Sequence, residues 1–490
     1  MSSPDPKTAA RFQQALSFHQ KGELAEARAI YEEISKIDPG NANVFHLLGV
    51  IASQQQNHQI ALILIDHAIS LNPIVAAYHS NRGLALHNLK RFREALESYD
   101  RAIQLRPDYA EALSNRGLAL SALNRFDEAL DSFNRAIRLQ PGFADAHSNR
   151  GNTLRELNRY DEALESYNRA IQLKPDFADA YLNASILFLK TGNFEKGWRL
   201  YERRWDVDSF GSPRRNFAQP LWLGQEPLNG KTILLHGEQG LGDTIQFCRY
   251  VKMTSELGAK VVLEVETPLL ELLRQLEGVS RCVAKGDALP PFDVHCPLMS
   301  LPLAFRTTLE TIPYSSPYLS AEPGKSGAWA KRIGENEQPL TGVVWSGSAS
   351  HKNDRNRSIP LATLLSALPE GFRYVSLQKE VGDSDREALE SHSGILHFGN
   401  ELKDFSDTAA LCGLMDVVIC VDTSVAHLSA AMGKPTWILL PYVTDWRWLT
   451  DRTDCPWYRS ARLYRQQAIG DWSGILQKVK EDLLQTLPMG

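Results

Sequence analysis

The sequence predicts a multidomain chain in which an all-α array of helical repeats precedes an α/β part made of two lobes. Two observations carry this prediction. Small residues and prolines recur every 34 residues through the first two hundred positions. Beyond residue 231, short apolar runs alternate with stretches of helical periodicity, which is typical of parallel sheets covered by helices. The length of 490 residues leaves room for two or three such domains.

The composition excludes several classes of function. The formal net charge is −5, which disfavours a non-specific nucleic-acid binder. No apolar run reaches the length of a membrane span, and the first residues lack a basic and then apolar leader. The six cysteines form no C-x-x-C pair, so we expect reduced core thiols rather than a disulfide framework or a zinc site. These features lead us to expect a cytoplasmic protein.

The N-terminal part keeps a strict 34-residue period. It is visible at Pro39, Pro73, Pro107, Pro141 and Pro175, at Ala27, Ala61, Ala95, Ala129 and Ala163, and at Gly49, Gly83, Gly117 and Gly151. The pattern resembles the tetratricopeptide repeat, in which each unit is a pair of antiparallel helices that packs on its neighbours. We expect five full repeats and a partial sixth within residues 8–205, and the array would also allow oligomers to form.

A second series with the same step is polar. Asn81, Asn115, Asn149 and Asn183 lie on the predicted first helices, which line the concave surface of a tetratricopeptide superhelix. This series resembles the array of the eukaryotic O-GlcNAc transferase, where such amides grip an extended peptide. A side-chain amide both donates and accepts, which suits a peptide backbone of any sequence. We therefore predict a peptide groove, interrupted by Leu47 in the second repeat; the alternative is that asparagine is only a tolerated polar residue at this position.

A connector rich in proline and glycine is predicted at residues 206–230, where no period is sustained. We expect three tryptophans to pack the last repeat onto the next domain, namely Trp198, Trp205 and Trp222. The first α/β lobe is expected at residues 231–320. The second lobe is expected at residues 321–490, with a helix at its end.

The first lobe opens with a short apolar strand at 232–235 and a glycine-rich turn. Gly240, Gly242 and Asp243 stand between this strand and a helical pattern. Glycines let a ligand approach the backbone closely, and the amides at a helix N-terminus favour negative charge. Asp243 can cap the helix or face the ligand. Taken alone the turn predicts only a capped helix, but a second matching motif near the C-terminus favours a ligand site.

The second lobe opens with an apolar strand that ends at Trp345, and we expect Trp345 and the following Ser346 to contact a bound donor. Small flexible residues then lead to three cations, Lys352, Arg355 and Arg357. Arginine suits bidentate contact with phosphate, and lysine adds a point charge. A loop directly after a central strand is therefore predicted to clamp phosphate; the alternative is a solvated surface loop.

Two further segments of the second lobe have open interpretations. Gln378, at another strand end, is a candidate contact to a nucleotide. The aromatic and charged segment 441–449 follows a strand and either lines a cleft or packs the lobes together. Asp383 and Asp385 match a D-x-D metal motif, but they precede a predicted helix and are better interpreted as its cap.

The matching motif of the second lobe follows the strand that ends at Cys420. The hydroxyls of Thr423 and Ser424, with the free amides of the helix that starts there, predict an anion site. Asp422 and His427 are polar residues in an otherwise small and apolar segment. For His427 alone, a buried structural histidine is the simpler interpretation.

Together the two motifs carry a family resemblance. Gly-Leu-Gly-Asp243, paired with Asp422-Thr-Ser-x-Ala-His427-Leu-x-Ala-Ala-x-Gly-Lys-Pro, is similar to glycosyltransferase family 9, the lipopolysaccharide heptosyltransferases. The resemblance implies the GT-B fold, with two Rossmann-like lobes and the active site in the cleft. It implies that Asp243 is the catalytic base, that Asp422 contacts the donor sugar, and that the helix start from Thr423 to His427 holds the diphosphate.

The resemblance also implies a basic residue on the first loop of the second lobe, which is Lys352, Arg355 or Arg357. The chain departs from the family in its short first lobe and in its repeat array, and both departures argue against a lipopolysaccharide acceptor.

We therefore expect an inverting, metal-independent glycosyltransferase that moves a sugar from a nucleotide-diphospho-sugar to a hydroxyl of a protein docked by the repeats. No cofactor is expected. Two alternatives stay open: an interaction scaffold whose α/β part binds a nucleotide sugar without turnover, and an enzyme that acts on a glycan. The sequence identifies neither the nucleotide base, the sugar nor the acceptor.

Overall fold

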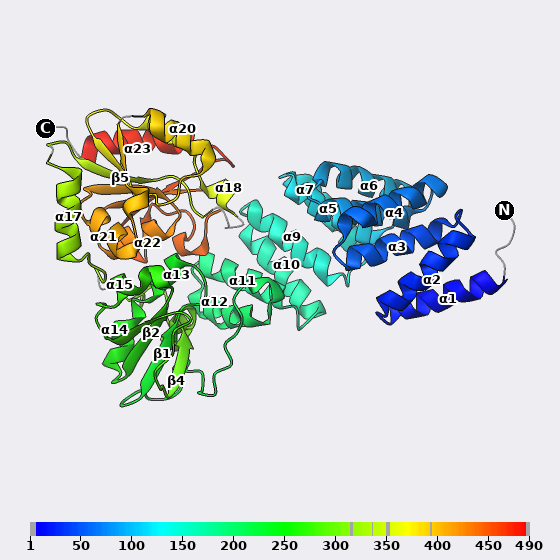
Figure 1. The fold of residues 1–490 in the computed structure, drawn as a ribbon, viewed down its shortest axis with the longest axis horizontal. Helices are drawn as coiled ribbons and strands as arrows, with labels where there is room; N and C mark the ends of the chain where they lie inside the picture. The colour runs from blue at the N-terminus through cyan, green and yellow to red at the C-terminus, as the bar shows by residue number, and fades with distance from the viewer. Residues whose placement is uncertain (1–5, 314–316, 336, 349–352, 393, 487–490) are drawn as a thin grey trace. The chain divides into compact units, whose positions relative to one another are not determined.

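The structure is a computed structural model that describes residues 6–313, 317–335, 337–348, 353–392 and 394–486 (Figure 1). The chain divides into two compact units, Met1–Ala184 and Ser185–Gly490. None of the described helices is long and apolar enough to cross a membrane.

Helices arranged in pairs build the N-terminal array, one pair for each 34-residue step. They are α1 Pro6–Gln20, α2 Leu24–Ile37, α3 Ala42–Gln54, α4 His58–Leu71, α5 Ala76–Asn88, α6 Phe92–Leu105, α7 Ala110–Ala122, α8 Phe126–Leu139, α9 Ala144–Glu156, α10 Tyr160–Leu173, α11 Ala178–Lys190 and α12 Phe194–Tyr201. This arrangement confirms the predicted all-helical array. The unit boundary falls within α11, so α12 belongs to the second unit.

The periodic glycines let an aromatic ring lie against the first helix of a pair. A Cβ atom on Gly83 would lie 2.6 Å from the Tyr99 ring, which comes from the second helix of the same pair. Gly117 and Gly151 stand in the same relation to the rings of Phe133 and Tyr167. The period in glycine is therefore a packing requirement, because any side chain would push the two helices apart.

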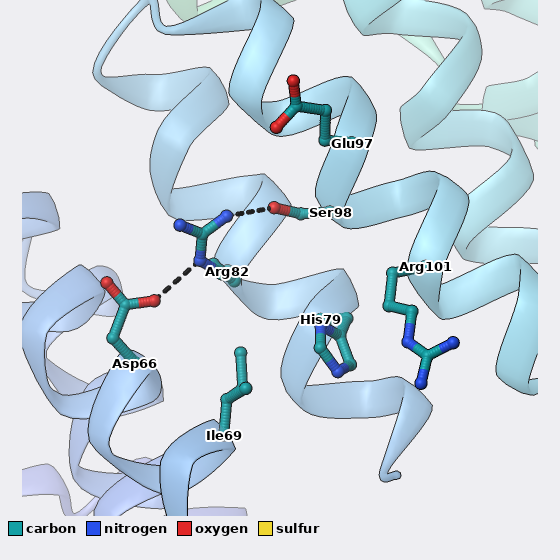
Figure 2. A pocket seen from close by; sticks show the side chains of 7 residues that line it. All are labelled: Asp66, Ile69, His79, Arg82, Glu97, Ser98 and Arg101. Atoms are coloured by element: carbon teal, nitrogen blue, oxygen red, sulfur yellow. Dashed lines mark hydrogen bonds and ion pairs between the residues drawn. The ribbon is translucent and has the colours of Figure 1, made fainter. Parts of the chain in front are cut away.

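A periodic arginine joins the third, fourth and fifth repeats each to the repeat before it. Arg82 of α5 donates to Asp66 of the preceding α4 at 2.6 Å and to Ser98 of its own partner helix α6 at 2.7 Å (Figure 2). The contacts recur one and two repeats later, as Arg116 with Asp100 and Ser132, and as Arg150 with Asn134 and Ser166. A surface cavity of about 350 Å³ lies beside Arg82, bordered by charged residues of α4, α5 and α6 (Figure 2).

The turn inside each pair contains a residue in the left-handed backbone region. These residues are Gly22, Gln56, Lys90, Asn124, Asn158 and Gly192, again one per 34-residue step. Glycine adopts this conformation without strain, whereas a side chain costs about 1–2 kcal/mol. Lys90, with φ of 60°, therefore stores strain that Gly22 and Gly192 avoid.

Replacing Lys90 by glycine should stabilise the array by roughly 0.5–1 kcal/mol, because the relieved strain exceeds the added entropy of the unfolded chain. The midpoint of urea unfolding, followed by circular dichroism, measures the change. The control Arg101→Gly lies on an exposed position inside α6 and should lose about 1 kcal/mol. An unchanged or lower midpoint for Lys90→Gly would contradict the assignment of strain.

The first α/β lobe contains a four-stranded parallel sheet in the order β3-β2-β1-β4. Its strands are β1 Thr232–His236, β2 Lys260–Val265, β3 Val279–Ala284 and β4 Val294–Pro297, and its helices are α13 Leu241–Phe247, α14 Tyr250–Glu256, α15 Leu270–Leu273 and α16 Leu301–Ala304. β1 is hydrogen-bonded on both sides and is buried along almost its whole length.

The second lobe contains a seven-stranded sheet in the order β10-β11-β9-β8-β5-β6-β7, parallel except for β10. Its strands are β5 Leu340–Val344, β6 Arg373–Ser376, β7 Ile395–His397, β8 Val417–Val421, β9 Thr436–Leu440, β10 Asp454–Cys455 and β11 Tyr458–Arg465. Its helices are α17 Pro323–Ile333, α18 Asp354–Arg357, α19 Leu361–Ala367, α20 Asp383–Ser391, α21 Phe405–Gly413, α22 Ser424–Ala431 and α23 Ser473–Thr486.

Helices cover both faces of the larger sheet. α19 and α23 pack against the strands in one apolar core, while α21 and α22 lie on the opposite face (Figure 1). β8 and β9 are buried at every residue, as expected for central strands of a parallel sheet. The prediction of an α/β region with parallel sheets is confirmed.

Candidate functional site

The strand orders locate one switch point in each sheet. In the first sheet the chain runs outward from β1 to β3 and then returns to the other side of β1 as β4. In the second sheet it runs from β5 to β7 and then returns to the other side of β5 as β8. Ligands of open parallel sheets bind beyond the carboxyl ends of strands at such points. The loops after β1, β5 and β8 are therefore the candidate site.

The loop after β1 ends at the start of α13. Gly240 is the residue before the helix, with extended backbone, and its N–H donates to Oδ2 of Asp243 at 3.2 Å. The carboxylate thus caps the helix, which is one of the two roles that the sequence allowed. About a fifth of the Asp243 side chain is exposed.

The loop after β8 ends at the start of α22. Thr423 precedes the helix, but its hydroxyl makes no capping bond. Within the described part of the chain, this Thr423 Oγ1 is a buried oxygen without a hydrogen-bond partner. The free amides of α22 and an unsatisfied hydroxyl meet at one point, which is chemically suited to bind an anion.

The two loops lie against each other. A Cβ atom on Gly242 would lie 2.9 Å from Cδ2 of His427 and 3.5 Å from Cα of Ser424. α13 and α22 therefore pack start to start, where their labels adjoin in Figure 1. The structure brings together Gly242, Asp243, Ser424 and His427, which stand about 180 residues apart in the sequence.

Arg447 ties the loop after β9 to the start of α13, and the sequence analysis did not single it out. It lies in the short helical turn η6 (Trp446–Trp448), and its Nε donates to Oε1 of Gln246 on α13 at 2.7 Å. Its Nη1 donates to Oδ1 of Asp445 at 2.9 Å, and its Nη2 donates to Oδ1 of Asp243. The only signal for it in the sequence is an arginine between two tryptophans directly after a strand. The segment 441–449 thus packs the lobes and also reaches the candidate site.

A second arginine stands at the start of α22. Nη1 of Arg357 donates to the backbone oxygen of Asp422 at 2.9 Å, and its Nε donates to Asp354 at 3.2 Å. A cation at a helix N-terminus opposes the helix dipole, and here the guanidinium is paired with the Asp354 carboxylate. Arg357 is therefore the cation of the predicted loop that the structure places beside the start of α22.

The charged groups around this point shift one another's ionisation. Burial raises the pKa of Asp422 to about 6, and the nearby Asp445 carboxylate adds to the shift. Burial lowers the pKa of His427 to about 3, with a further contribution from Arg447. The His427 ring is neutral at physiological pH, stacks on Trp448 at 5.2 Å between centroids, and shares a 2.9 Å hydrogen bond between Nδ1 and the Tyr458 hydroxyl.

The other residues that the sequence predicted to contact the donor each have a different environment. The Trp345 side chain is fully buried in the core of the second lobe, where its indole N–H donates to Asp385 at 2.9 Å. Gln378 is buried and accepts from the backbone N–H of Ser346 at 3.4 Å. Arg355 is exposed on α18. Lys352 lies outside the described residues.

Asp385 has a structural partner on each oxygen, because Oδ1 accepts from the backbone N–H of Leu361 at 3.0 Å. Among the residues with described positions, no three carboxylates, imidazoles or thiols lie close enough together to hold a metal ion.

The last helical pair, α11 and α12, packs against the loop after β9 that contains Arg447. The ring of Trp198 on α12 contacts Trp446 at 5.2 Å and Phe247 of α13 at 6.2 Å. Nζ of the buried Lys190 donates to the backbone oxygen of Thr444 at 2.9 Å. Of the three tryptophans expected at this junction, Trp198 makes the contact with the α/β loops.

The two other tryptophans have separate neighbours. Trp205 packs on Phe210 in the connector, and Trp222 packs on Phe305 of the first lobe. A buried ion pair adds to the same junction: Arg204 donates to both oxygens of Glu238, in the loop after β1, at 2.9 Å.

Two of the four asparagines in the predicted series are hydrogen-bonded to other side chains in the structure. Asn81 is bonded to His46 at 2.7 Å, and Asn183 accepts a weak 3.4 Å bond from Arg155. In the described chain, no other side chain is bonded to the amides of Asn115 or Asn149. A cavity of about 150 Å³ beside Asn149 is lined by Leu118, Ser121, Asn124, Phe126, Asn149, Asn152, Thr153 and Glu156.

Comparisons with known proteins identify repeats in the N-terminal helical array. Models described as tetratricopeptide repeat match residues 9–41, 74–142 and 132–165, and one described as TPR repeat matches residues 151–192. The N-terminal array therefore consists of tetratricopeptide repeats, which typically present a surface to peptide or protein partners.

One curated relative is Protein FlbA of Caulobacter vibrioides, which is 26% identical over 321 residues, or 60% of this chain and 53% of FlbA. The chain thus spans about half the length of this relative. MamA is a similar solved structure, with 23% identity and a TM-score of 0.31 over 34% of this chain and 96% of MamA. YrrB, a TPR protein with an unusual peptide-binding site, has 26% identity and a TM-score of 0.31 over 35% of this chain and 88% of YrrB.

The depressed pKa of His427 predicts acid sensitivity. Below about pH 6.5 the unfolded histidine takes up a proton that the folded one, with a pKa of about 3, does not, so stability falls as the pH is lowered. Between pH 7 and pH 5 this one residue should cost about 2 kcal/mol. In His427→Phe the loss of stability over that interval should be smaller by this amount, measured by urea unfolding at both pH values. An identical pH dependence in both proteins would contradict the buried, neutral assignment.

Proposed function

We propose that the second unit is a GT-B glycosyltransferase that moves a sugar from a nucleotide-diphospho-sugar to a hydroxyl acceptor. The observation that carries the proposal is the meeting of two switch-point loops, one with a carboxylate and one with an anion site. A nucleotide sugar has complementary chemistry, because its diphosphate needs an anion site and its anomeric carbon needs a nearby base.

The anion side of the site suits a leaving diphosphate. Negative charge that develops on the phosphate as the glycosidic bond breaks would be stabilised by the amides of α22, the Thr423 hydroxyl and Arg357. These groups are fixed before the reaction by the helix and by the bond from Arg357 to Asp422, so no reorganisation is needed. Asp422, beside them, would orient the sugar.

The carboxylate side of the site suits a general base. In the proposed step Asp243 takes the proton of the acceptor hydroxyl, and the hydroxyl oxygen attacks the anomeric carbon. The bond from that carbon to the diphosphate breaks at the same time. Attack from the face opposite the leaving group inverts the anomeric configuration. Base assistance of this kind is worth roughly 10²–10⁴ in rate. Arg447 would hold the Asp243 carboxylate in position during the reaction.

The repeats suggest a protein acceptor. The cavity beside Asn149 lies between the first helices of two successive repeats, where an extended chain could run along the array. Asn115 and Asn149 would donate to and accept from its backbone. Because Asn81 is held by His46, we place the proposed groove at the fourth and fifth repeats rather than along the whole series.

A second candidate function is favoured by one observation. Asp243 is ion-paired with Arg447, and the loops around Gly242 and His427 are in contact. A unit that binds a nucleotide sugar in this arrangement without turnover would make the protein a repeat-based interaction scaffold. Transfer and donor-hydrolysis assays with UDP-, GDP-, ADP- and CMP-sugars separate the two candidates, since the scaffold would shift in melting temperature with a donor but release no nucleoside diphosphate.

Asp243→Asn should lower the transfer rate by about 10²–10⁴-fold, because asparagine cannot accept the acceptor proton. Donor binding, measured by titration calorimetry, should change little. The matched control is Asp287→Asn, at an exposed aspartate of the same lobe, which should leave the rate unchanged. Full turnover by a folded Asp243→Asn variant would exclude the proposed base.

A further inference from the structure

Exposed apolar side chains gather in one short part of the repeats. Of the ten large apolar residues that are exposed in the described chain, six lie between residues 37 and 84. Two of them, Ile60 and Ile63, lie one turn apart on α4 and expose 53% and 61% of their surface. Their spacing places them on one face of the helix. We call this pair the α4 patch.

The other repeats show what normally occupies these positions. At the position of Ile60 the first, third, fourth and fifth repeats carry Glu26, Glu94, Glu128 and Glu162. At the position of Ile63 they carry Ala29, Glu97, Asp131 and Glu165, and the partial sixth repeat has Lys196 and Arg199 at the two positions. The outer surface of the second helix is thus acidic in the third, fourth and fifth repeats and apolar in the second.

The second repeat lacks an ion pair that the third, fourth and fifth repeats have at this position. Glu94 is bonded to Arg91 at 2.6 Å, and the pairs Arg125–Glu128 and Arg159–Glu162 repeat this contact. The second repeat has Asn57 and Ile60 in place of the pair. Both partners are replaced together, so no charge is left unpaired.

Internal packing explains other apolar exchanges in this repeat but not these two. Leu48 and Leu64 stand where the third repeat has Arg82 and Ser98, and both lie in the apolar core of the first repeats. Ile60 and Ile63 face outward instead. Covering their surface would gain roughly 25 cal/mol for each Å² removed from water.

We propose that the α4 patch is a self-association surface that docks on the same patch of a second copy of this chain. In a two-fold contact each residue near the axis meets its own counterpart, so a charged patch would repel itself. The acidic positions of α6, α8 and α10 are unsuited to such a contact. α4 carries one acidic residue, Asp66, and two histidines but no lysine or arginine, and the Asp66 carboxylate is paired with Arg82 at 2.6 Å (Figure 2).

The charge of the whole chain narrows the choice of surface further. Two copies with a net charge of −5 repel one another, so they associate where the local charge is neutral and apolar area can be buried. One 14-residue helix supplies less than the ~800 Å² per partner of a standard interface. The dimer is therefore weak, with a dissociation constant on the order of micromolar.

Sedimentation velocity of the full chain tests the proposal at concentrations from about 1 to 100 µM, which bracket a micromolar dissociation constant. The wild-type chain should pass from monomer to dimer over this range, and added salt should not reverse the association. The double variant Ile60→Glu, Ile63→Glu carries the residues that the third and fifth repeats have at these positions, so it should fold. It should associate at least tenfold more weakly.

The control is Leu139→Glu, which puts a charge on an exposed leucine at the end of α8, and it should associate like the wild type. Equal melting temperatures of the wild type and the double variant exclude unfolding as the cause of a change. A wild-type chain that stays monomeric overturns the proposal and leaves a different protein as the occupant. A double variant that dimerises like the wild type also overturns it.

Discussion

The candidate site depends on one side chain, Arg447, which ties the loop after β9 to the start of α13. Its guanidinium is bonded to Asp243 and Gln246 on one lobe and to Asp445 on its own loop. A buried arginine is favourable only when its donors are matched by acceptors, and removing one partner of such a group typically costs 3–5 kcal/mol. The ion pair therefore holds Asp243 and the start of α13 against the loop after β9 of the other lobe.

The same loop is also held by the last helical pair. Trp446, next to Arg447, lies against Trp198 of α12, and the backbone of Thr444 accepts from Lys190. Arg204, which follows α12, is fully buried against Glu238 in the loop after β1. The α/β unit therefore begins before its first strand, since these residues supply part of its core. A cut in the connector at residues 206–230 would remove them and leave Glu238 as a buried charge without its partner.

Much of the architecture could be predicted from local patterns. The 34-residue period is the direct result of packing, because Gly83 and its equivalents face an aromatic ring in the third, fourth and fifth repeats and Ile65 in the second. The parallel sheets could be predicted because β8 is apolar throughout and β9 is apolar after Thr436. The residues Asp243 and Asp422 stood out because each lies between a strand and a helix, at the carboxyl end of a parallel strand where ligands of such sheets bind.

The remainder depended on contacts that no local pattern encodes. Arg447 reaches Asp243 across about two hundred positions of the chain, and an isolated arginine in an aromatic segment has no periodic signal. The indole N–H of Trp345, directly after β5, donates to Asp385 of α20, a partner 40 residues away in the sequence. Lys90 adopts a left-handed backbone although its side chain disfavours it, because the turn between two packed helices requires that conformation. Tertiary packing decided all three.

A crystal structure of the full chain with a bound nucleotide sugar tests the central claim most directly. The donor would be chosen by a thermal-shift screen of UDP-, GDP-, ADP- and CMP-sugars. The account predicts the diphosphate at the start of α22, in contact with the Thr423 hydroxyl and Arg357, with the anomeric carbon facing Asp243. A nucleotide bound elsewhere, or a sugar turned away from Asp243, would contradict it.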